Sequence, residues 1–489
     1  MADENTRTYD VIVLGAGPVG ENVADRTIAA GLSTAIVESE LVGGECSYWA
    51  CEPSKALLRP VLLYGEASRF PGVGSAVTGP IDAAAVLRHR DYMVADWDDK
   101  GQVDWVASAG ITLLRGHGRL AGPRQVTVET TEGETVRLTA RQAVAVCTGS
   151  RAALPSLPNL DTLRYWTSRE ATSAEQVPGR LVILGAGVVA VEMATAWQAL
   201  GAQVTLVARG SGLLGRMESF ASDLVADRLR TAGADLRFGS GIAAAERPDG
   251  PDGEIRVTLT DGSRIVADEL LFATGRAPRT DDIGLDAIGL KPGTWLTTDD
   301  TFTVDAVEGD WLYAVGDVNH RALLTHQGKY QARIAGGVIA DRARGAGLDT
   351  GTWGRSVGTA DHLAVPQVVF TDPEITAVGL TSQDAEREGR AVDVVDYEIG
   401  HVAGAVQHDP KYVGRARVLI DPERRTLLGA TFAGAGVAEL LHSATIAIAG
   451  EVTIDRLWHA VPSFPTISEV WLRLLEAYRD RQAGSTGGQ

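Results

Sequence analysis

Short apolar runs that each end at a glycine recur along this chain, and they predict the buried strands of an α/β fold. The run Tyr9–Leu14 leads into Gly15-Ala16-Gly17-Pro18-Val19-Gly20, and a helical stretch follows to Ala30. The next run, Ser33–Val37, predicts a second strand, which Glu38 closes. Continuous apolar runs of this length are typical of parallel strands buried on both faces, so we expect a strand–helix–strand unit.

The same order of elements returns later in the chain. The run Leu181–Leu184 precedes Gly185-Ala186-Gly187-Val188-Val189-Ala190, a helix is expected through Leu200, and Gln203–Val207 predicts the following strand. Each glycine-rich turn fits the pattern that places a dinucleotide at a strand-to-helix turn. The sequence therefore predicts that the chain binds two dinucleotides, or that it is one enzyme that passes electrons between two such cofactors.

Three further apolar runs predict strands that connect these units. Val144–Ser150 and Leu270–Arg276 each predict a strand that ends in Thr-Gly, where the chain is expected to cross between domains. Trp311–Asp317 predicts another strand, which ends in Gly316-Asp317 at a turn. From about Val365 the chain becomes strand-rich, with two helical stretches near its end, which indicates an α+β domain.

The first glycine-rich turn carries the residues of a dinucleotide site. Gly15 permits the tight turn, Gly17 lets a pyrophosphate approach the backbone, and Gly20 lets the helix pack closely on the strand. Glu38 stands where an acidic side chain meets a ribose hydroxyl. The alternative is a glycine-rich turn without a ligand, and the complete set of strand, helix and acid argues against it.

The second unit differs where nucleotide specificity is set. Its second strand ends in Leu206-Val207-Ala208-Arg209, with no carboxylate at the ribose position, and Arg216 follows. A missing acid removes repulsion, and two arginines can bind a 2′-phosphate. The pattern favours NADPH over NADH, and the alternative is that both arginines merely face solvent.

Cys46 and Cys51 lie five residues apart, downstream of the first fingerprint, and Cys147 is the only other cysteine. Two thiols so placed suggest an enzyme that stores two electrons in a disulfide. A regular helix would separate their Cα atoms by about 7.5 Å along its axis, whereas disulfides rarely span more than about 7 Å. If the two residues bond, the chain between them must depart from α geometry. Cys147 lies in a buried strand pattern and is expected to be a core residue.

Composition narrows the classes of partner. The 63 acidic and 45 basic residues give a net charge of −18, which argues against nucleic acid or an anionic membrane as the main partner. The segment Met1–Asp10 is polar, and no uncharged apolar run reaches the roughly 18 residues needed to span a bilayer. Three cysteines do not form a disulfide scaffold, so a cytoplasmic protein with one redox pair is expected. No metal site is predicted.

In combination these motifs resemble those of the flavoprotein disulfide reductases, the class I pyridine nucleotide-disulfide oxidoreductase family, which includes dihydrolipoamide dehydrogenase, glutathione reductase and mercuric reductase. The resemblance runs from Tyr9 to about Arg479. Its markers are Gly15-x-Gly17-x-x-Gly20, Cys46-x4-Cys51-x-Pro53-Ser54-Lys55, Gly185-x-Gly187-x-x-Ala190-x-Glu192, Ala273-Thr274-Gly275-Arg276-x-Pro278, Gly316-Asp317 and Phe370-Thr371-Asp372-Pro373-Glu374.

The resemblance implies two doubly wound, Rossmann-like nucleotide-binding domains and a C-terminal α+β dimerisation domain. The FAD-binding domain would comprise residues 1–158 and 282–358, the NAD(P)-binding domain residues 159–281, and the dimerisation domain residues 359–489. A homodimer is implied, because the C-terminal segment should complete the active site of the partner.

The resemblance also assigns cofactors and roles. Cys51 would lie against the flavin, Cys46 would attack the substrate, and Lys55 would contact the flavin and pair with Glu192. Val188 would stand at the nicotinamide entry. FAD would be held by Gly15, Gly17, Gly20, Glu38, Lys55, Gly149, Gly316 and Asp317. NADPH, with NADH as the alternative, would be held by Gly185, Gly187, Val188, Ala190, Arg209, Arg216 and Gly275.

The chain departs from the family pattern inside the redox segment. Tyr48 and Trp49 are bulky where relatives usually carry small or aliphatic residues, and Ala50 stands where Gly is usual. Glu52 replaces an aliphatic residue beside Cys51. A carboxylate next to a thiolate should raise the thiol pKa, unless the carboxylate points to solvent.

A second departure lies near the C-terminus. The family ends in His-Pro-Thr…Glu, whose His serves as acid and base across the dimer. Here Phe464-Pro465-Thr466-Ile467-Ser468-Glu469 keeps Glu469, which is expected to be catalytic, but Phe464 replaces the His. Phe cannot transfer a proton, and losing a general acid or base typically slows a reaction about 10²–10⁴-fold. His459 is the alternative base, although an ordinary local histidine is the simpler interpretation. No cysteine follows Cys147, so a C-terminal thiol relay is not expected.

These features favour an FAD-dependent NAD(P)H oxidoreductase with a redox-active Cys46–Cys51 disulfide. Its acceptor would be a small disulfide whose leaving thiol has a low pKa, because such a thiol needs less help from an acid. One alternative is a quinone-type (diaphorase) reductase that uses the disulfide as an electron store. Another is a flavin redox sensor with little turnover, which the loss of the His would permit.

Overall fold

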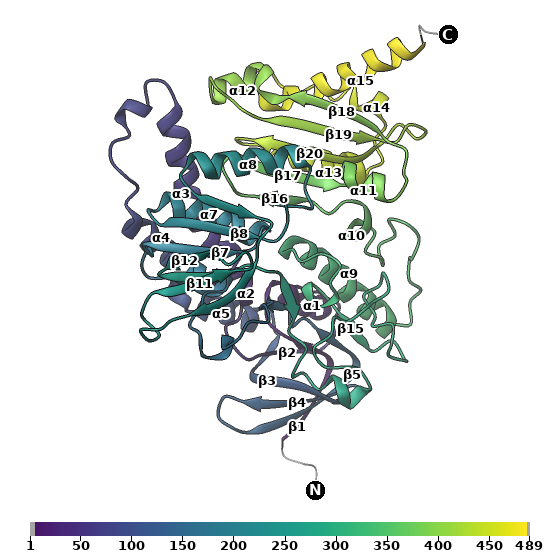
Figure 1. Cartoon of the computed structure of the whole chain (residues 1–489). Coiled ribbons are helices and arrows are strands. Elements are labelled where there is room, and N and C mark those ends of the chain that lie inside the picture. The colour runs from purple at the N-terminus through teal and green to yellow at the C-terminus, as the bar shows by residue number, and fades with distance from the viewer. Residues whose placement is uncertain (1–4, 487–489) are drawn as a thin grey trace. The chain divides into compact units, whose positions relative to one another are not determined.

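The structure is a computed structural model that describes residues 5–486, with side chains to residue 483 (Figure 1). The chain divides into two compact units. The first unit comprises Met1–Pro53, Arg90–Ala153 and Arg276–His362. The second comprises Ser54–His89, Leu154–Gly275 and Leu363–Gln489. The first four residues of the polar N-terminal segment lie outside the described part. The four-part domain division expected from the sequence stays a prediction.

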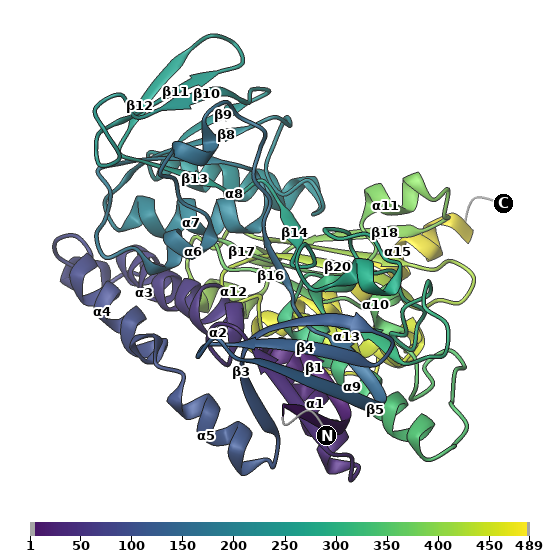
Figure 2. The ribbon, with the colours of Figure 1, turned by 90° about the horizontal axis from the view of Figure 1, so that it is seen from below.

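The first unit is built on a mostly parallel sheet. Its parallel strands pair in the order β3-β2-β1-β5-β15. Strand β4 joins β3 to β5 by antiparallel pairing, so the three strands lie side by side (Figure 2). The bounds are β1 Thr6–Leu14, β2 Thr34–Glu38, β3 Thr112–Gly122, β4 Gln125–Thr130, β5 Thr135–Val146 and β15 Leu312–Ala314. The pairing of β15 with β5 confirms that the chain returns to its first sheet after residue 300.

Helices α1 and α9 lie side by side in this unit (Figures 1 and 2). Helix α1 (Pro18–Ala29) starts with Pro18, whose fixed φ suits the first helical turn. Helix α9 (Thr325–Ala343) approaches α1 closely, since a Cβ built at Gly336 would lie 2.6 Å from Cβ of Arg26. The remaining helices around this unit are α2 Gly44–Tyr48, α5 Lys100–Ser108 and α10 Ala360–Leu363, while α3 Cys51–Arg69 and α4 Ala83–Met93 run across the unit boundaries.

The Thr-Gly segments differ from their prediction. The preceding strands β5 and β13 (Glu269–Phe272) end at Val146 and Phe272, before Thr-Gly is reached. The glycines explain the early ends, because Gly149 (φ +72°) and Gly275 (φ +131°) adopt positive φ and break the extended chain. Two short strands follow, β6 (Ser150–Ala152) and β14 (Arg276–Pro278), and they pair with each other in the first unit.

The second unit contains another parallel sheet, with the order β9-β8-β7-β13. Next to it in sequence is the antiparallel sheet β10-β11-β12. The bounds are β7 Arg180–Leu184, β8 Gln203–Ala208, β9 Asp235–Phe238, β10 Ile242–Glu246, β11 Ile255–Leu259 and β12 Arg264–Ala267, with helices α6 Ser168–Ser173, α7 Val188–Ala199 and α8 Ser219–Thr231. The strand–helix–strand order predicted around the second glycine-rich turn is confirmed.

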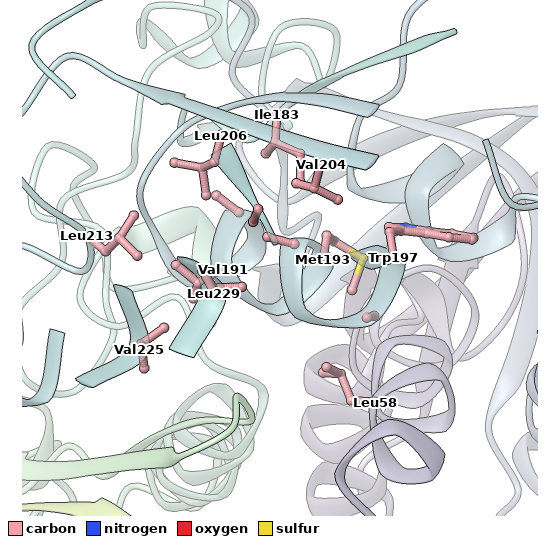
Figure 3. Packing of buried hydrophobic residues seen from close by; sticks show 14 of the residues in the cluster. Leu58, Ile183, Val191, Met193, Trp197, Val204, Leu206, Leu213, Val225 and Leu229 are labelled. Carbon is pink, nitrogen blue, oxygen red and sulfur yellow. The ribbon is translucent and has the colours of Figure 1, made fainter. Parts of the chain in front are cut away.

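The core of this parallel sheet is made by helix faces packed on the strands. Figure 3 shows Met193 and Trp197 of α7 between Val204 of β8 and Leu58 of α3. Trp197 is fully buried, so α7 is fixed on the sheet by a large apolar area. This packing holds the start of α7 at the glycine-rich turn.

The C-terminal part of the second unit is a five-stranded antiparallel sheet, ordered β16-β17-β20-β19-β18. Its strands are β16 Gln367–Val369, β17 Glu374–Gly379, β18 Asp393–Glu398, β19 Arg415–Ile420 and β20 Leu427–Gly434. Its helices are α11 Ser382–Arg387, α12 Ala403–His408, α13 Leu441–Ala449, α14 Ile454–Leu457 and α15 Val470–Thr486. The predicted α/β class with a C-terminal α+β part is confirmed. Within residues 5–486 no helix is long and apolar enough to cross a membrane.

Candidate active site

The first glycine-rich turn has the shape of a phosphate cradle. Gly15 has φ +98°, and a Cβ there would lie 2.5 Å from the carbonyl oxygen of Cys147. A Cβ at Gly20 would lie 1.9 Å from the carbonyl oxygen of Gly15. Packing therefore requires glycine at both positions. At Gly17 a Cβ would meet only Cα of Gly44 at 3.9 Å, so the side left open there fits the close approach of a diphosphate.

Two carboxylates predicted to contact FAD occupy polar sites in the same unit. Glu38 accepts hydrogen bonds from the backbone N–H of Ala16 (2.7 Å), so it lies against the glycine-rich turn. Asp317 accepts from the hydroxyl of Ser150 (2.5 Å), which in turn accepts from Nε of Arg276 (2.9 Å). Burial raises the pKa of Asp317, against the effect of these partners. Ser150 and Arg276 were not among the predicted site residues.

The chain between Cys46 and Cys51 leaves α geometry. Helix α2 ends at Tyr48, Trp49 has φ −138° and ψ 1°, and helix α3 begins at Cys51. The predicted interruption is confirmed. Both cysteines are thiols in this structure. Cys51 thereby stands at the N-terminus of a 19-residue helix, where the helix dipole stabilises a thiolate.

The surroundings of the two thiols are unequal. Sγ of Cys51 lies 3.3 Å from Oγ1 of Thr325, the first residue of α9. The hydrogen bond to Cys51 and burial raise the pKa of the Cys46 thiol, against a smaller lowering by a hydrogen bond with Thr325. Glu52 is exposed, and its charge is the smallest of the contributions that raise the pKa of Cys46. The arrangement therefore favours negative charge on Cys51 and the proton on Cys46. Cys147 is buried, as expected of a core residue, and burial raises its pKa.

The bulky residues of the redox segment pack against their own unit. Tyr48 is buried, and a Cβ at Gly43 would lie 3.0 Å from its ring. The indole N–H of Trp97 donates to the carbonyl oxygen of Tyr48 (3.1 Å). Glu45, which precedes Cys46, accepts from the guanidinium of Arg279 (2.9 Å). These contacts hold both ends of α2, and no local sequence signal indicates Trp97 or Arg279.

The predicted pairing of Lys55 with Glu192 is present in the second unit. Nζ of Lys55 lies 2.8 Å from Oε2 of Glu192. The other carboxylate oxygen, Oε1, accepts the backbone N–H of Phe370 (3.0 Å), and the Lys55 ammonium lies 4.9 Å from the centre of the Phe370 ring. Both oxygens of a nearly buried carboxylate are therefore paired.

The second glycine-rich turn repeats the geometry of the first. Gly185 has φ +143°, and a Cβ there would lie 2.2 Å from the carbonyl oxygen of Ala273. At Gly187 a Cβ would meet no heavy atom within 4 Å, so this glycine leaves open space at the start of α7. Ala190 is fully buried, whereas the side chain of Val188 is 37% exposed at the first turn of the helix. This turn fits a second diphosphate.

Arg209 and Arg216 follow strand β8, as the sequence indicates. Both side chains are exposed, and neither forms an ion pair with a described residue. Unpaired guanidinium groups beyond the end of the second strand are suited to a 2′-phosphate. Gly275 belongs to the turn between β13 and β14.

The C-terminal motif has no proton carrier at its expected position. Phe464 is 75% exposed and Val461 is 85% exposed in the single chain. Glu469 is buried, and one of its oxygens accepts from Arg473 (2.7 Å). His459 is exposed. Among residues 5–486, no group of three or more His, Cys, Asp or Glu side chains is placed to hold a metal ion.

The chain is similar over most of its length to known redox enzymes. Residues 9–333 match the model of pyridine nucleotide-disulphide oxidoreductases, and residues 365–475 match the dimerisation domain of the same enzymes. A dihydrolipoyl dehydrogenase of Halobacterium salinarum is 31% identical over 488 residues, which cover 97% of each chain. A mercuric reductase of Staphylococcus aureus is 28% identical over 466 residues, which cover 94% of this chain and 81% of that protein.

A solved structure shares the fold. The Cu(II) complex of the HOCl-induced flavoprotein disulfide reductase RclA from Escherichia coli superposes with a TM-score of 0.81 at 21% identity, covering 96% of this chain and 99% of that chain. The family uses FAD and a nicotinamide nucleotide, and its dimerisation domain supports a homodimer. The two glycine-rich turns, the paired thiols and the matched regions lead to one conclusion: the chain belongs to the pyridine nucleotide-disulphide oxidoreductase family and is an enzyme of that class.

Proposed function

We propose that this enzyme passes electrons from NADPH through FAD and a Cys46–Cys51 disulfide to a small acceptor. The observation that carries the proposal is the unequal pair of thiols at a helix break, with Cys51 at the start of α3 and hydrogen-bonded to Thr325. The first glycine-rich turn, with Glu38, Lys55 and Asp317, would hold FAD. Bound FAD would carry the electron pair of a hydride to sulfur. Each residue role below is part of this proposal.

The thiols carry out the chemistry at sulfur. An electron pair from NADPH breaks the S–S bond, leaving Cys51 as the thiolate and Cys46 able to hold a proton. Cys46 then attacks a small disulfide RSSR and gives up its proton, which ends on the departing sulfur, so a mixed disulfide forms and one thiol is released. Attack by Cys51 on Cys46 reforms the internal disulfide and releases the second thiol. In sum, NADPH, one proton and RSSR give NADP⁺ and two RSH.

Lys55 and Glu192 support the flavin side of this cycle. The pair keeps the Lys55 ammonium charged and fixed in position, because Glu192 is itself held by the N–H of Phe370. Val188 lies exposed at the nucleotide turn, where it would border the nicotinamide. Arg209 and Arg216 support NADPH as the donor, because they are exposed and unpaired among the described residues.

The kind of acceptor that we propose depends on Phe464, which stands where a histidine would act as acid and base. A disulfide whose leaving thiol has a low pKa departs without a general acid, so it suits a site that lacks the histidine. A quinone is the second candidate, favoured by the same observation, because its reduction needs no base at the interchange thiol. Glu469 would retain a supporting role in the active site of the homodimer. Reducible catalytic thiols suit the cytoplasm.

Steady-state NADPH oxidation against a panel of aromatic disulfides, glutathione disulfide, lipoamide and quinones tests the proposal. We expect the highest kcat/KM with the aromatic disulfides, and loss of that activity in Cys46→Ser. If Cys46→Ser leaves every activity intact, the disulfide is not catalytic and the proposal fails. Reduction of the protein by NADPH without turnover of any acceptor would instead indicate a redox sensor.

A further inference from the structure

A shallow surface cavity of about 370 Å³, open to one side, lies in the first unit between the C-terminal parts of α1 and α9. The two helices run side by side (Figures 1 and 2). Ala29 and Ala30 line the cavity, so it lies at the opposite end of α1 from the glycine-rich turn. Its volume is within the range of about 300–1,000 Å³ found for small-molecule sites.

The floor of the cavity is made of small residues that packing does not require. A Cβ at Gly337 would meet no heavy atom within 4 Å, whereas a Cβ at the neighbouring Gly336 would lie 2.6 Å from Arg26. Glycine in a helix interior destabilises the helix relative to alanine. Close helix packing therefore explains Gly336 but not Gly337. Gly337 is exposed and lines the cavity without a side chain.

The wall of the cavity carries an excess of positive charge. Arg26, Arg344 and Arg355 line it, against one carboxylate, Asp341, which is 8% exposed. Asp341 binds Arg344 at 2.8 Å and Arg355 at 3.2 Å, while the nearest carboxylate to Arg26 is that of Asp25 at 3.7 Å. Three cations and one anion line the cavity, and Asp25 is paired with Arg26, so the local charge is positive in a chain whose net charge is −18.

Arg355 is presented by a loop that is ordered through its own hydrogen bonds. The backbone N–H of Asp349 donates to Oγ of Ser356 (3.2 Å), and the N–H of Ser356 donates back to the carbonyl oxygen of Asp349 (3.1 Å). A Cβ at Gly354 would lie 2.5 Å from that same carbonyl oxygen, so the turn requires glycine there. These contacts fix the backbone that carries Arg355, and a fixed backbone loses less entropy when a ligand binds.

We propose that this cavity is a binding site for a small phosphate-bearing molecule. Arginines from α1, from the end of α9 and from the 349–356 loop line it, with side chains 51%, 57% and 68% exposed. A guanidinium group can donate two parallel hydrogen bonds to phosphate oxygens. Asp341 pairs with two of these arginines. The site is separate from both glycine-rich turns.

Isothermal titration of the FAD-loaded full-length protein with inorganic pyrophosphate tests this site. We expect one pyrophosphate per chain beyond the nucleotide sites. Arg26→Ser and Arg355→Ser should each weaken binding about tenfold or more, because each removes charge-assisted hydrogen bonds. Gly337→Leu should abolish binding by filling the floor while leaving all three arginines in place.

Matched controls separate this site from others. Arg333→Ser, at an exposed position of α9 outside the cavity, and Gly101→Leu, at a helical glycine with no atom within 4 Å of its Cβ, should bind pyrophosphate like the wild type. Absence of binding to the wild type would overturn the proposal. So would binding that Gly337→Leu leaves intact, or binding that Arg209→Ser removes, since the anion would then occupy the nucleotide site.

Discussion

Nζ of Lys55 lies 2.8 Å from Oε2 of Glu192, and this contact joins helices α3 and α7. The sequence predicts that both residues support electron transfer through the flavin. The Glu192 side chain is 5% exposed and that of Lys55 is 37% exposed. A carboxylate so deeply buried depends on its partner for charge compensation.

Lys55→Met should therefore lower the stability of the fold as well as the rate of the reaction. Glu192 would be left buried without its cation, so we expect the free energy of unfolding to fall by about 2 kcal/mol, a value reduced for the partial exposure of Lys55. Urea unfolding measures the change. Lys100→Met, which breaks the exposed pair with Asp104, is the matched control and should leave stability unchanged. Equal stability of both variants would contradict the importance of the buried pair.

Thr325→Val should make the Cys51 thiolate harder to form. The substitution keeps the shape of the side chain and removes the hydroxyl that lies 3.3 Å from Sγ. We expect the midpoint of the long-wavelength thiolate–flavin absorption band of the reduced enzyme to move to higher pH, because hydrogen bonds stabilise a charged acceptor. Thr325→Ser retains the hydroxyl and should behave like the wild type. A Val variant with an unchanged titration would mean that the hydroxyl does not act on the thiolate.

Glu21 in the first turn of α1 should make stability fall as pH rises. Burial raises its pKa from 4.5 to about 7, and its Oε1 has no hydrogen-bond partner in the described part of the chain. Between pH 4.5 and 7 the folded state binds the proton more tightly than the unfolded state, so stability is lost over that range. Relative to Glu21→Gln, the free energy of unfolding of the wild type should fall by about 3 kcal/mol over this pH range.

The measurement for Glu21 is urea unfolding at several pH values. Glu52→Gln, at an exposed carboxylate of α3, serves as the control and should keep the pH dependence of the wild type. Parallel pH profiles for Glu21→Gln and the wild type would show that Glu21 is not the group responsible.

Phe464→His should extend the range of acceptors. Glu469 is already in place five residues later in the motif, and a histidine could supply the proton that leaving thiols of high pKa require. We expect kcat with glutathione disulfide or lipoamide to rise about 10²-fold, with little change for aromatic disulfides. His459→Ala should leave all rates unchanged, because His459 is exposed and is not needed in this mechanism. A loss of activity in His459→Ala would instead identify it as the substitute base.

Arg209→Ala and Arg216→Ala should lower the preference for NADPH. Each removes a guanidinium suited to the 2′-phosphate, so we expect KM for NADPH to rise about tenfold while KM for NADH stays the same. Arg237→Ala, on the neighbouring strand β9 and already paired with Asp235 at 2.8 Å, is the control. Unchanged NADPH kinetics in both variants would show that the two arginines only face solvent.

Much of this fold could be predicted because local patterns decide it. Apolar runs followed by glycines at fixed spacing specify a strand, a tight turn and a helix, and the backbone at Gly15 and Gly185 confirms why only glycine fits there. The cysteine spacing predicted a break in the helix if the two residues are to bond, and the break lies at Trp49. The resemblance to a family supplied the partner of Lys55, which the local pattern alone could not identify.

The tertiary structure decided which distant groups complete each site. Thr325 reaches Cys51 across 274 residues of chain, and Arg279 reaches Glu45 across 234. Such contacts leave no periodicity in the sequence, since they depend on how sheets and helices pack. The cavity between α1 and α9 also leaves no signal in the sequence. The sequence alone does not show that Gly337 lines it. The sequence by itself determined the nucleotide turns and the redox pair, because steric limits on the backbone act locally. Packing decided the surroundings of each thiol, because neighbours such as Thr325 are brought to them only by the fold.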